Sequence, residues 1–186
     1  GRICPAPCEK VCRRKQHDEA VSICLLKRYV ADVDLQSGQP YRPTPAPKNG
    51  KRVAIIGAGP AGLAAAYYLQ LDGFDCTIFD EHDEPGGMLR YAVTERNLPR
   101  DVLSREIQQI ARLGVTFRLR MRVGVAILLD EIRQQFDAVF LATGELKAGD
   151  ADALGIDASS DDVKIDPRTG TASIPGVFAG GDVVRK

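Results

Sequence analysis

Residues 52–62, RVAIIGAGPAG, place a glycine-rich turn between a short apolar run and an alanine-rich segment. The turn has the spacing G-x-G-x-x-G, and a strand before it with a helix after it is the context that this motif requires. Gly57 permits the tight turn, Gly59 lets the backbone approach a pyrophosphate, and Gly62 allows the helix to pack closely on the strand. The N-terminus of that helix would offer N–H groups and a positive dipole end to an anion. The stretch therefore predicts a dinucleotide-binding α/β fold.

Apolar runs and amphipathic segments alternate through the rest of residues 51–186. We expect strands over residues 52–57, 75–80, 115–120, 137–142 and 176–179. We expect helices over residues 60–72, 99–113 and 128–135. Strands separated by helices imply right-handed crossovers and a mainly parallel sheet. The predicted fold class is α/β, a Rossmann-like domain preceded by a small α-helical, cysteine-rich segment.

Three zones divide the chain. Residues 1–35 contain four cysteines and a segment with helical spacing of apolar residues, for which Asp18 is the expected N-cap. Residues 36–50, QSGQPYRPTPAPKNG, hold four prolines and two glycines and are expected to form an extended linker. Residues 51–186 form the predicted dinucleotide-binding domain.

The composition excludes several classes of protein. The chain has 186 residues, of which 44% are hydrophobic, and its 25 basic and 25 acidic residues give a net charge of zero. The hydrophobic fraction argues against wholesale disorder. The net charge of zero argues against a general surface for nucleic acid or anionic membranes. Apolar runs stay shorter than the roughly 18 residues of a membrane span. Four of the five cysteines fall within residues 1–24, which favours a reducing cytoplasm over a secreted disulfide scaffold.

Asp80 and three later motifs bear on the choice of dinucleotide. Asp80 ends the second expected strand, where an acid can accept hydrogen bonds from ribose hydroxyls and disfavours a 2′-phosphate. Three further features favour FAD over NAD: Gly86-Gly87 after a short polar loop that follows Asp80, Ala142-Thr143-Gly144 after a buried strand, and residues 174–182, IPGVFAGGD, at the C-terminus. An NAD-binding dehydrogenase domain remains an alternative.

The sequence shows little sign of hydrolytic or disulfide chemistry. His17 and His82 are its two histidines, neither lies in a nucleophile motif, and His82 is expected as a surface residue of the loop after Asp80. Cys76 lies inside an expected strand and is predicted to be a core residue. No residue in the sequence stands out as an acid, a base or a nucleophile, so we name none as catalytic.

The order of these motifs resembles the FAD half of a flavoprotein family, that of the NADPH-dependent glutamate synthase small (beta) subunit. The same module occurs in the N-terminal part of dihydropyrimidine dehydrogenase. The likeness runs from GRICP through VAIIGAGPAGL, PGGML and FDAVFLATG to FAGGD. It implies that Asp80 holds the adenosine ribose, that residues 87–89 lie along the cofactor, that Val123 meets the adenine through its backbone, and that Asp182 contacts the ribityl and pyrophosphate region. The predicted FAD-binding residues are Gly57, Gly59, Pro60, Ala61, Gly62, Asp80, Glu81, Gly87, Met88, Leu89, Val123, Ala142, Thr143, Gly144, Gly181 and Asp182.

The resemblance implies electron flow from NADPH or NADH through FAD to iron–sulfur clusters and then to an electron-accepting subunit or domain. In this family an NADPH domain lies between the Ala-Thr-Gly and Phe-Ala-Gly-Gly-Asp motifs, where this chain has 35 residues between Gly144 and Gly180. A βαβ unit alone takes about 30 residues, so we expect that the NADPH domain is missing around residues 145–150. We also expect that the chain is cut at both ends. The alternative function is an FAD-binding module without catalysis of its own.

Cys4, Cys8 and Cys12 form the pattern C-x₃-C-x₃-C, and Cys24 follows in the expected helix. Thiolates are the usual ligands of iron–sulfur clusters, and the spacing is not the paired C-x₂-C of a zinc site. The resemblance implies that Cys4, Cys8 and Cys12 are shared between two [4Fe–4S] clusters in the full-length parent, and we predict Cys24 as a further ligand. Four reduced thiols without a cluster are the alternative.

Overall fold

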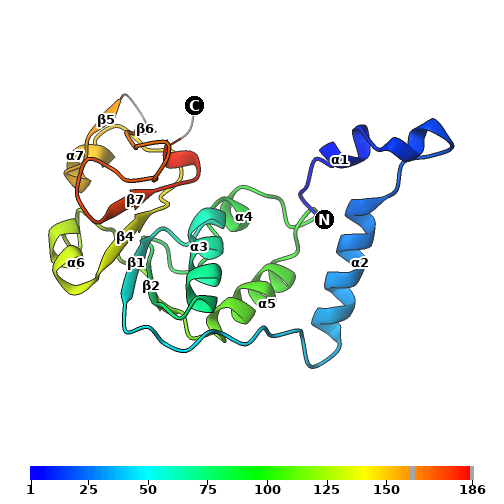
Figure 1. Ribbon diagram of the computed structural model, residues 1–186, viewed down its shortest axis with the longest axis horizontal. Coiled ribbons are helices and arrows are strands. Elements are labelled where there is room, and N and C mark those ends of the chain that lie inside the picture. The colour runs from blue at the N-terminus through cyan, green and yellow to red at the C-terminus, as the bar shows by residue number, and fades with distance from the viewer. Residues whose placement is uncertain (160–161, 185–186) are drawn as a thin grey trace.

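The computed structural model describes residues 1–159 and 162–184. An N-terminal part, residues 1–36, lies apart from an α/β part that begins at residue 52 (Figure 1). Residues 37–51 connect them without helix or strand. The linker is fastened at its end, where the Ala46 and Asn49 N–H groups donate to the carbonyls of Leu71 and Gly73 at 2.7 and 3.0 Å.

Five strands form one parallel sheet. They are β1 (Arg52–Ile56), β2 (Asp75–Phe79), β3 (Thr116–Arg118), β4 (Ala138–Leu141) and β7 (Val177–Ala179), in the order β3-β2-β1-β4-β7. Every neighbouring pair in this sheet is parallel, and Val53 of β1 lies between Cys76 of β2 and Ala138 of β4. The predicted α/β fold with a mainly parallel sheet is confirmed.

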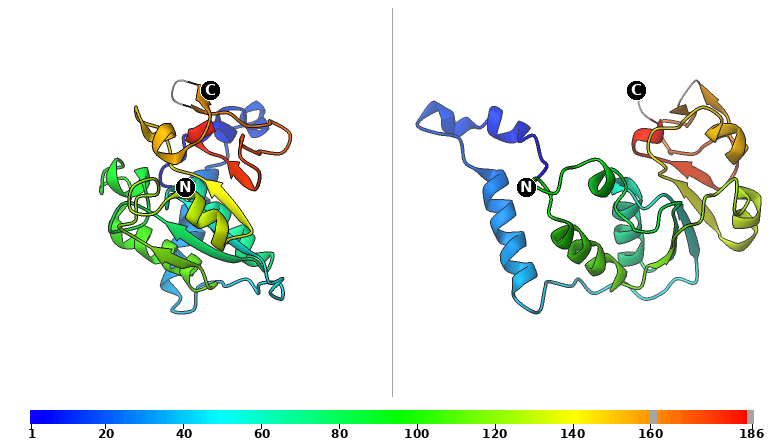
Figure 2. Two further views of the ribbon diagram at one scale, coloured as in Figure 1. Left: turned by 90° about the vertical axis from the view of Figure 1, so that its left-hand side faces the viewer. Right: turned by 180° about the vertical axis from the view of Figure 1, so that it is seen from behind.

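Alternate residues of β1 enter two different cores. Val53 and Ile55 pack with α3 (Pro60–Leu71) and α5 (Arg100–Ala111). Ala54 and Ile56 pack on the other face with α6 (Leu129–Gln135) and the C-terminal segments. Figures 1 and 2 show α3 and α5 on the side of the sheet toward the N-terminal part, with α6 on the opposite side. Both faces are thus covered, which explains why the central strands are continuous apolar runs.

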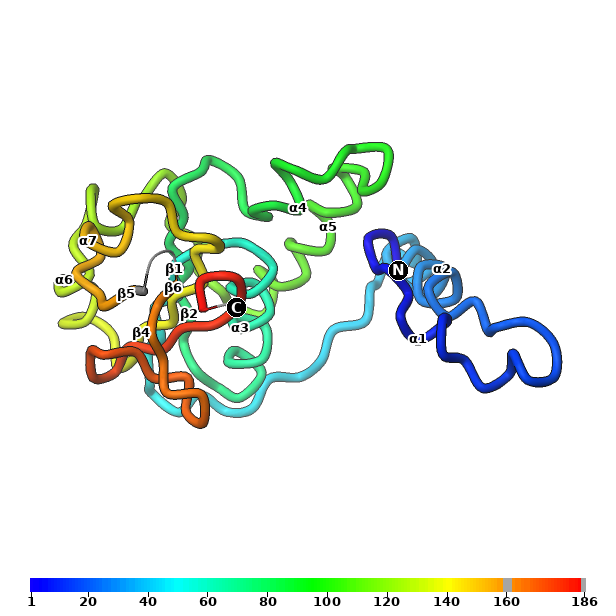
Figure 3. The backbone as a smooth tube through the Cα atoms, turned by 90° about the horizontal axis from the view of Figure 1, so that it is seen from above, coloured from blue at the N-terminus to red at the C-terminus, as the bar shows by residue number. Residues whose placement is uncertain are grey.

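The remaining elements are one longer helix of the N-terminal part and several short helices, turns and strands. They are α1 (Pro7–Lys10), a 3₁₀ turn (Arg13–Gln16), α2 (Ile23–Gln36), α4 (Met88–Tyr91), α7 (Asp150–Leu154), the antiparallel pair β5 (Ala158–Ser159) and β6 (Asp162–Val163), and a 3₁₀ turn (Asp182–Val184). Figure 3 shows α1 and α2 at the end of the molecule away from α6 and α7. A side-chain hydrogen bond from Arg105 to the Leu35 carbonyl joins α5 to α2.

The predicted capping role of Asp18 is wrong. Helix α2 begins at Ile23, and Ser22 is its N-cap residue. The Asp18 carboxylate instead accepts two hydrogen bonds from the guanidinium of Arg14, at 2.7 and 2.5 Å. The Asp18 carboxylate is therefore paired with Arg14, four residues earlier, and does not accept an N–H group at the start of α2.

Candidate dinucleotide-binding site

Four loops meet at the carboxyl edge of the sheet. Residues 57–62 follow β1, residues 80–87 follow β2, residues 142–144 follow β4, and residues 180–182 follow β7. Because all these strands are parallel, their carboxyl ends share one edge, which is where open α/β sheets bind ligands. The structure thus brings most of the predicted cofactor residues to one place.

Glycines allow these loops to touch. Gly87 has φ +50°, and a Cβ there would lie 2.7 Å from the Cα of Gly59. A Cβ on Gly181 would likewise lie 2.7 Å from the Cβ of Ala61. The Gly86 N–H donates to the Ala58 carbonyl at 2.9 Å and ties the second loop to the first. Backbone rather than side chain therefore lines the cradle, so a ligand can approach the main chain closely.

The start of α3 opens into this cradle. The first N–H of the helix to bond within it is that of Leu63, which donates to the Gly59 carbonyl at 2.9 Å. The N–H groups of Ala61 and Gly62 come earlier in the first turn, where helical N–H groups have no intrahelical acceptor. A glycine-lined cradle in front of these donors fits the pyrophosphate of a dinucleotide.

Asp80 lies at the end of β2 with only 8% of its surface exposed. Its Oδ2 accepts the Ala58 N–H at 2.6 Å, and its Oδ1 accepts the His82 N–H at 2.9 Å. The His82 ring nitrogen Nδ1 also lies 2.8 Å from Oδ1. The prediction for His82 missed this contact, since its ring is engaged with the buried carboxylate although 43% of the side chain stays exposed. The sequence signal for this contact is the spacing Asp-x-His, which places the His82 ring within reach of the Asp80 carboxylate.

The other predicted residues around Asp80 differ in their surroundings. Glu81 forms an ion pair with Arg122 at 3.4 Å, and Arg122 also binds Asp150 at 2.8 Å, which fastens α7 to the loop after β2. Val123 is buried beside this pair. On the remaining loops, Ala142 is buried, whereas Met88, Thr143 and Asp182 are exposed.

The cysteines of the N-terminal part do not all come together. Cys4 and Cys24 are hydrogen-bonded thiols: the Ala6 N–H and then the Cys24 thiol lower the pKa of Cys4, and burial and Cys4 raise the pKa of Cys24. The N–H groups of Val21 and Arg14 lower the pKa of Cys12. Within residues 1–159 and 162–184 there is no group of three or more His, Cys, Asp or Glu placed to hold a metal ion. The four-cysteine ligand set stays a prediction.

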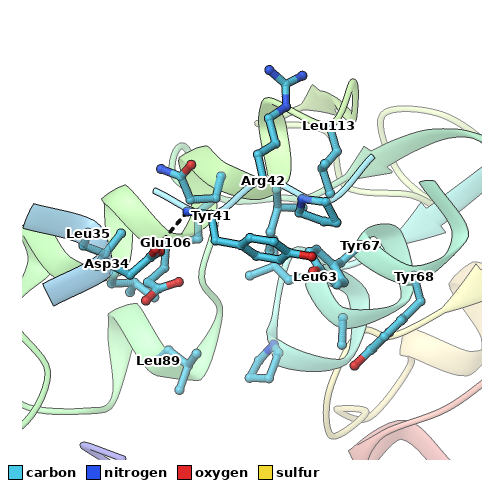
Figure 4. Close-up of a pocket in the computed structure, with 17 residues that line it drawn as sticks. Asp34, Leu35, Tyr41, Arg42, Leu63, Tyr67, Tyr68, Leu89, Glu106 and Leu113 are labelled. Carbon is cyan, nitrogen blue, oxygen red and sulfur yellow. Dashed lines mark hydrogen bonds between the residues drawn. The ribbon is translucent and has the colours of Figure 1, made fainter. Parts of the chain in front are cut away.

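A separate cavity of about 500 Å³ lies between the end of α2, residues 41–43, α3 and α5. Figure 4 shows Tyr41 from the linker facing Tyr67 and Leu63 of α3, with Glu106 of α5 at its side. Pro60 and Leu89 are the predicted cofactor residues among its lining. Leu89 packs with the core on this side of the sheet, so it is turned toward the cavity and the helices.

Comparison with known protein families and sequences also indicates a dinucleotide-binding fold. Residues 55–123 match the family described as NAD(P)-binding Rossmann-like domain. The NADP(+)-dependent formate dehydrogenase subunit beta of Moorella thermoacetica is 45% identical over 77% of this chain and 23% of its own length. The glutamate synthase [NADPH] small chain of Bacillus subtilis is 40% identical over 81% of this chain and 30% of its own. The NAD-dependent dihydropyrimidine dehydrogenase subunit PreT of Salmonella typhimurium is 34% identical over 98% and 46%.

The chain is a homologue of the glutamate synthase small chain and of subunits of related NADP(+)- and NAD-dependent oxidoreductases. The predicted resemblance is therefore confirmed. The chain spans less than half the length of each of these three relatives. Across the part of the chain that the structure describes, every helix is too short or too polar to cross a membrane.

Proposed function

We propose that this chain is the FAD-binding part of an NAD(P)H-dependent oxidoreductase that feeds electrons to a partner subunit or domain. The observation that supports this most is the cradle in which the Gly59, Gly87 and Gly181 loops meet in front of α3, beside the buried carboxylate of Asp80. Such a cradle suits a long dinucleotide better than a mononucleotide, because it combines a pyrophosphate site with a ribose acceptor.

The chain's own residues bind and orient the cofactor. The first turn of α3 would hold the pyrophosphate, Asp80 would accept from a ribose hydroxyl, and the Gly180–Gly181 turn would lie over the start of α3. FAD, when bound, supplies the chemistry that takes a hydride from NADPH or NADH and releases electrons one at a time. The relatives are named as subunits, which supports an electron-accepting partner. In the intact parent, [4Fe–4S] clusters near Cys4, Cys8, Cys12 and Cys24 would be the next electron acceptors.

Two alternatives are supported by specific observations. The matched family is described as NAD(P)-binding, which favours a domain that binds a nicotinamide dinucleotide in the same cradle. The 35 residues between Gly144 and Gly180 are too few for a second nucleotide domain, which favours an FAD-binding module without catalysis of its own.

An absorption spectrum separates these functions. The chain is purified, incubated with FAD, freed of unbound cofactor, and then treated with NADPH or NADH without oxygen. Flavin bands that bleach quickly support the reductase, and bands that persist support the binding module. A colourless protein that binds NADH contradicts FAD binding and supports the nicotinamide alternative.

A further inference from the structure

The carboxylate of Asp80 is already held by three groups of the chain. Oδ2 accepts the Ala58 N–H from the phosphate loop, and Oδ1 accepts both the main-chain N–H and the ring of His82. A carboxylate offers about four acceptor positions, two on each oxygen. Oδ1 is therefore filled, and Oδ2 is the oxygen with room for one more donor.

The ring of His82 acts as a hydrogen-bond donor in this arrangement. An ionised carboxylate only accepts hydrogen bonds, so the proton must lie on Nδ1 at the 2.8 Å contact with Oδ1. The two contacts from one residue, N–H and Nδ1–H, close a small ring around Oδ1 and prevent rotation of the carboxylate about its Cβ–Cγ bond.

A second aromatic ring fixes His82 itself. The Tyr91 ring of α4 stacks on the imidazole with centroids 4.5 Å apart and an interplanar angle of 26°. The Tyr91 hydroxyl lies 3.2 Å from the Asp83 carboxylate and from the Glu84 carbonyl, so it is held to the same loop as His82. Helix α4 begins directly after Gly87, which touches the phosphate loop.

We propose that His82 is a positioning residue that sets Asp80 for the adenosine ribose of the bound dinucleotide. The proposal rests on the proposed FAD-binding function. Locked by His82, Asp80 presents Oδ2 to a ribose hydroxyl while it keeps its bond to the phosphate loop. The ribose acceptor and the pyrophosphate site are thereby coupled through one side chain, and His82 holds that side chain in place without touching the cofactor.

Three substitutions separate the hydrogen bond from the packing. His82→Asn keeps an amide N–H at the position of Nδ1 but lacks the ring. His82→Phe keeps a ring to stack on Tyr91 but lacks the donor. Asp80→Ala removes the group through which His82 is proposed to act.

The measurement is the Kd of FAD for the full chain, by titration of cofactor-free protein, together with its melting temperature. His82→Phe should weaken FAD binding about tenfold, as expected for a lost hydrogen bond to a charged group, and His82→Asn should stay within about threefold of the original chain. In the Asp80→Ala background, His82→Phe should change the Kd less than twofold, because coupled residues are not additive. The melting temperature of each His82 variant without cofactor should lie well above the temperature of the titration, which shows that both variants are folded when FAD is added.

Several results would overturn the proposal while leaving FAD binding intact. These are unchanged affinity of His82→Phe, equal losses in His82→Asn and His82→Phe, or a full tenfold effect of His82→Phe in the Asp80→Ala background. If Asp80→Ala binds too weakly to titrate, the comparison of His82→Asn with His82→Phe still decides. If the unsubstituted chain binds no FAD, it is the proposed function that fails.

Discussion

At Gly87 the chain passes so close to the phosphate loop that a methyl group has no room. A Cβ there would lie 2.7 Å from the Gly59 Cα, which belongs to main chain that cannot swing aside. We expect Gly87→Ala to push the two loops apart and to weaken FAD binding about ten- to a hundredfold, since overpacking costs about 1–3 kcal/mol. Titration of cofactor-free protein with FAD measures this.

Gly149→Ala is the matched control for Gly87→Ala. Gly149 also has a positive φ, +87°, but a Cβ there meets nothing within 4 Å. It should cost about 1–2 kcal/mol of stability through the left-handed backbone and leave the Kd of FAD unchanged. Equal affinity of Gly87→Ala and the original chain would contradict the close contact between the loops.

Cys76 should make the stability of the protein fall in alkali. Only 3% of its surface is exposed, which confirms it as a core residue, and burial raises its pKa from 9.0 to about 11. Between these pH values the unfolded thiol ionises and the folded one does not, so the stabilisation present below pH 9 is lost as the pH rises toward 11. At about 1.4 kcal/mol per pKa unit the loss is about 2–3 kcal/mol.

Urea unfolding at pH 7, 9 and 10.5 checks the effect of Cys76 against Cys76→Ala. Lysines and tyrosines titrate in both proteins, so the difference in slope isolates the thiol. The original chain should lose stability more steeply than Cys76→Ala above pH 9. Parallel pH profiles would show that the thiol ionises as freely in the folded protein as in the unfolded one.

Single residues could be predicted from the sequence where their role depends on spacing alone. Gly57, Gly59 and Asp80 follow from a motif and a strand end, and the structure places them at one edge of the sheet. The contacts of His82 depend on how the loop after β2 folds back against α4. No periodic pattern encodes such a path, so the sequence alone places His82 at the surface, where 43% of its side chain is exposed, but does not predict these contacts.

Gln70 ties three elements together inside the domain. Its side chain is fully buried in α3, where Nε2 donates to the Leu113 carbonyl after α5 at 3.0 Å and Oε1 accepts the Cys76 N–H of β2 at 3.2 Å. Gln70→Leu keeps the volume but leaves both main-chain groups without this partner. Since an unsatisfied buried group costs about 1–3 kcal/mol, we expect a loss of about 2–4 kcal/mol in the free energy of unfolding.

Denaturation in urea measures the loss for Gln70→Leu, and Gln108→Leu on the exposed face of α5 serves as its control. The control makes the same chemical change where water can replace the side chain, so its effect should stay within about 0.5 kcal/mol. Similar losses in both variants would show that the contacts of Gln70 contribute little.

Long periodic elements were predictable, and short ones were not. The sequence pattern predicts the strands and the helices α3, α5 and α6 within one or two residues at most ends, because burial on both faces makes the central strands apolar runs and packing on the sheet gives the helices a period of 3.6. The pattern missed α4 and α7, whose four and five residues complete hardly more than one turn. Their formation depends on contacts such as Arg122 with Asp150, which join distant parts of the chain.

On the scale of the whole molecule, the two cores of the α/β part exclude the N-terminal zone. Neither cluster of buried residues on the two faces of the sheet contains a residue from positions 1–50. The four loops of the site also lie between residues 57 and 182. The division into a cysteine-rich zone, a linker and a dinucleotide-binding domain remains a prediction from composition, and folding of the domain alone would support it.

A chain that begins at Gly50 should therefore fold and bind FAD with a Kd within about threefold of the full chain, because a factor of three corresponds to less than 1 kcal/mol. The contacts it loses lie outside both cores and include the hydrogen bond of Arg105 with Leu35, the packing of Tyr41 above α3, and the hydrogen bonds of the linker with Leu71 and Gly73. Calorimetry and FAD titration of both chains make the comparison. An unfolded or cofactor-free shorter chain would show that α2 and the linker, which cover the cavity beside α3, are required for the domain to hold its shape.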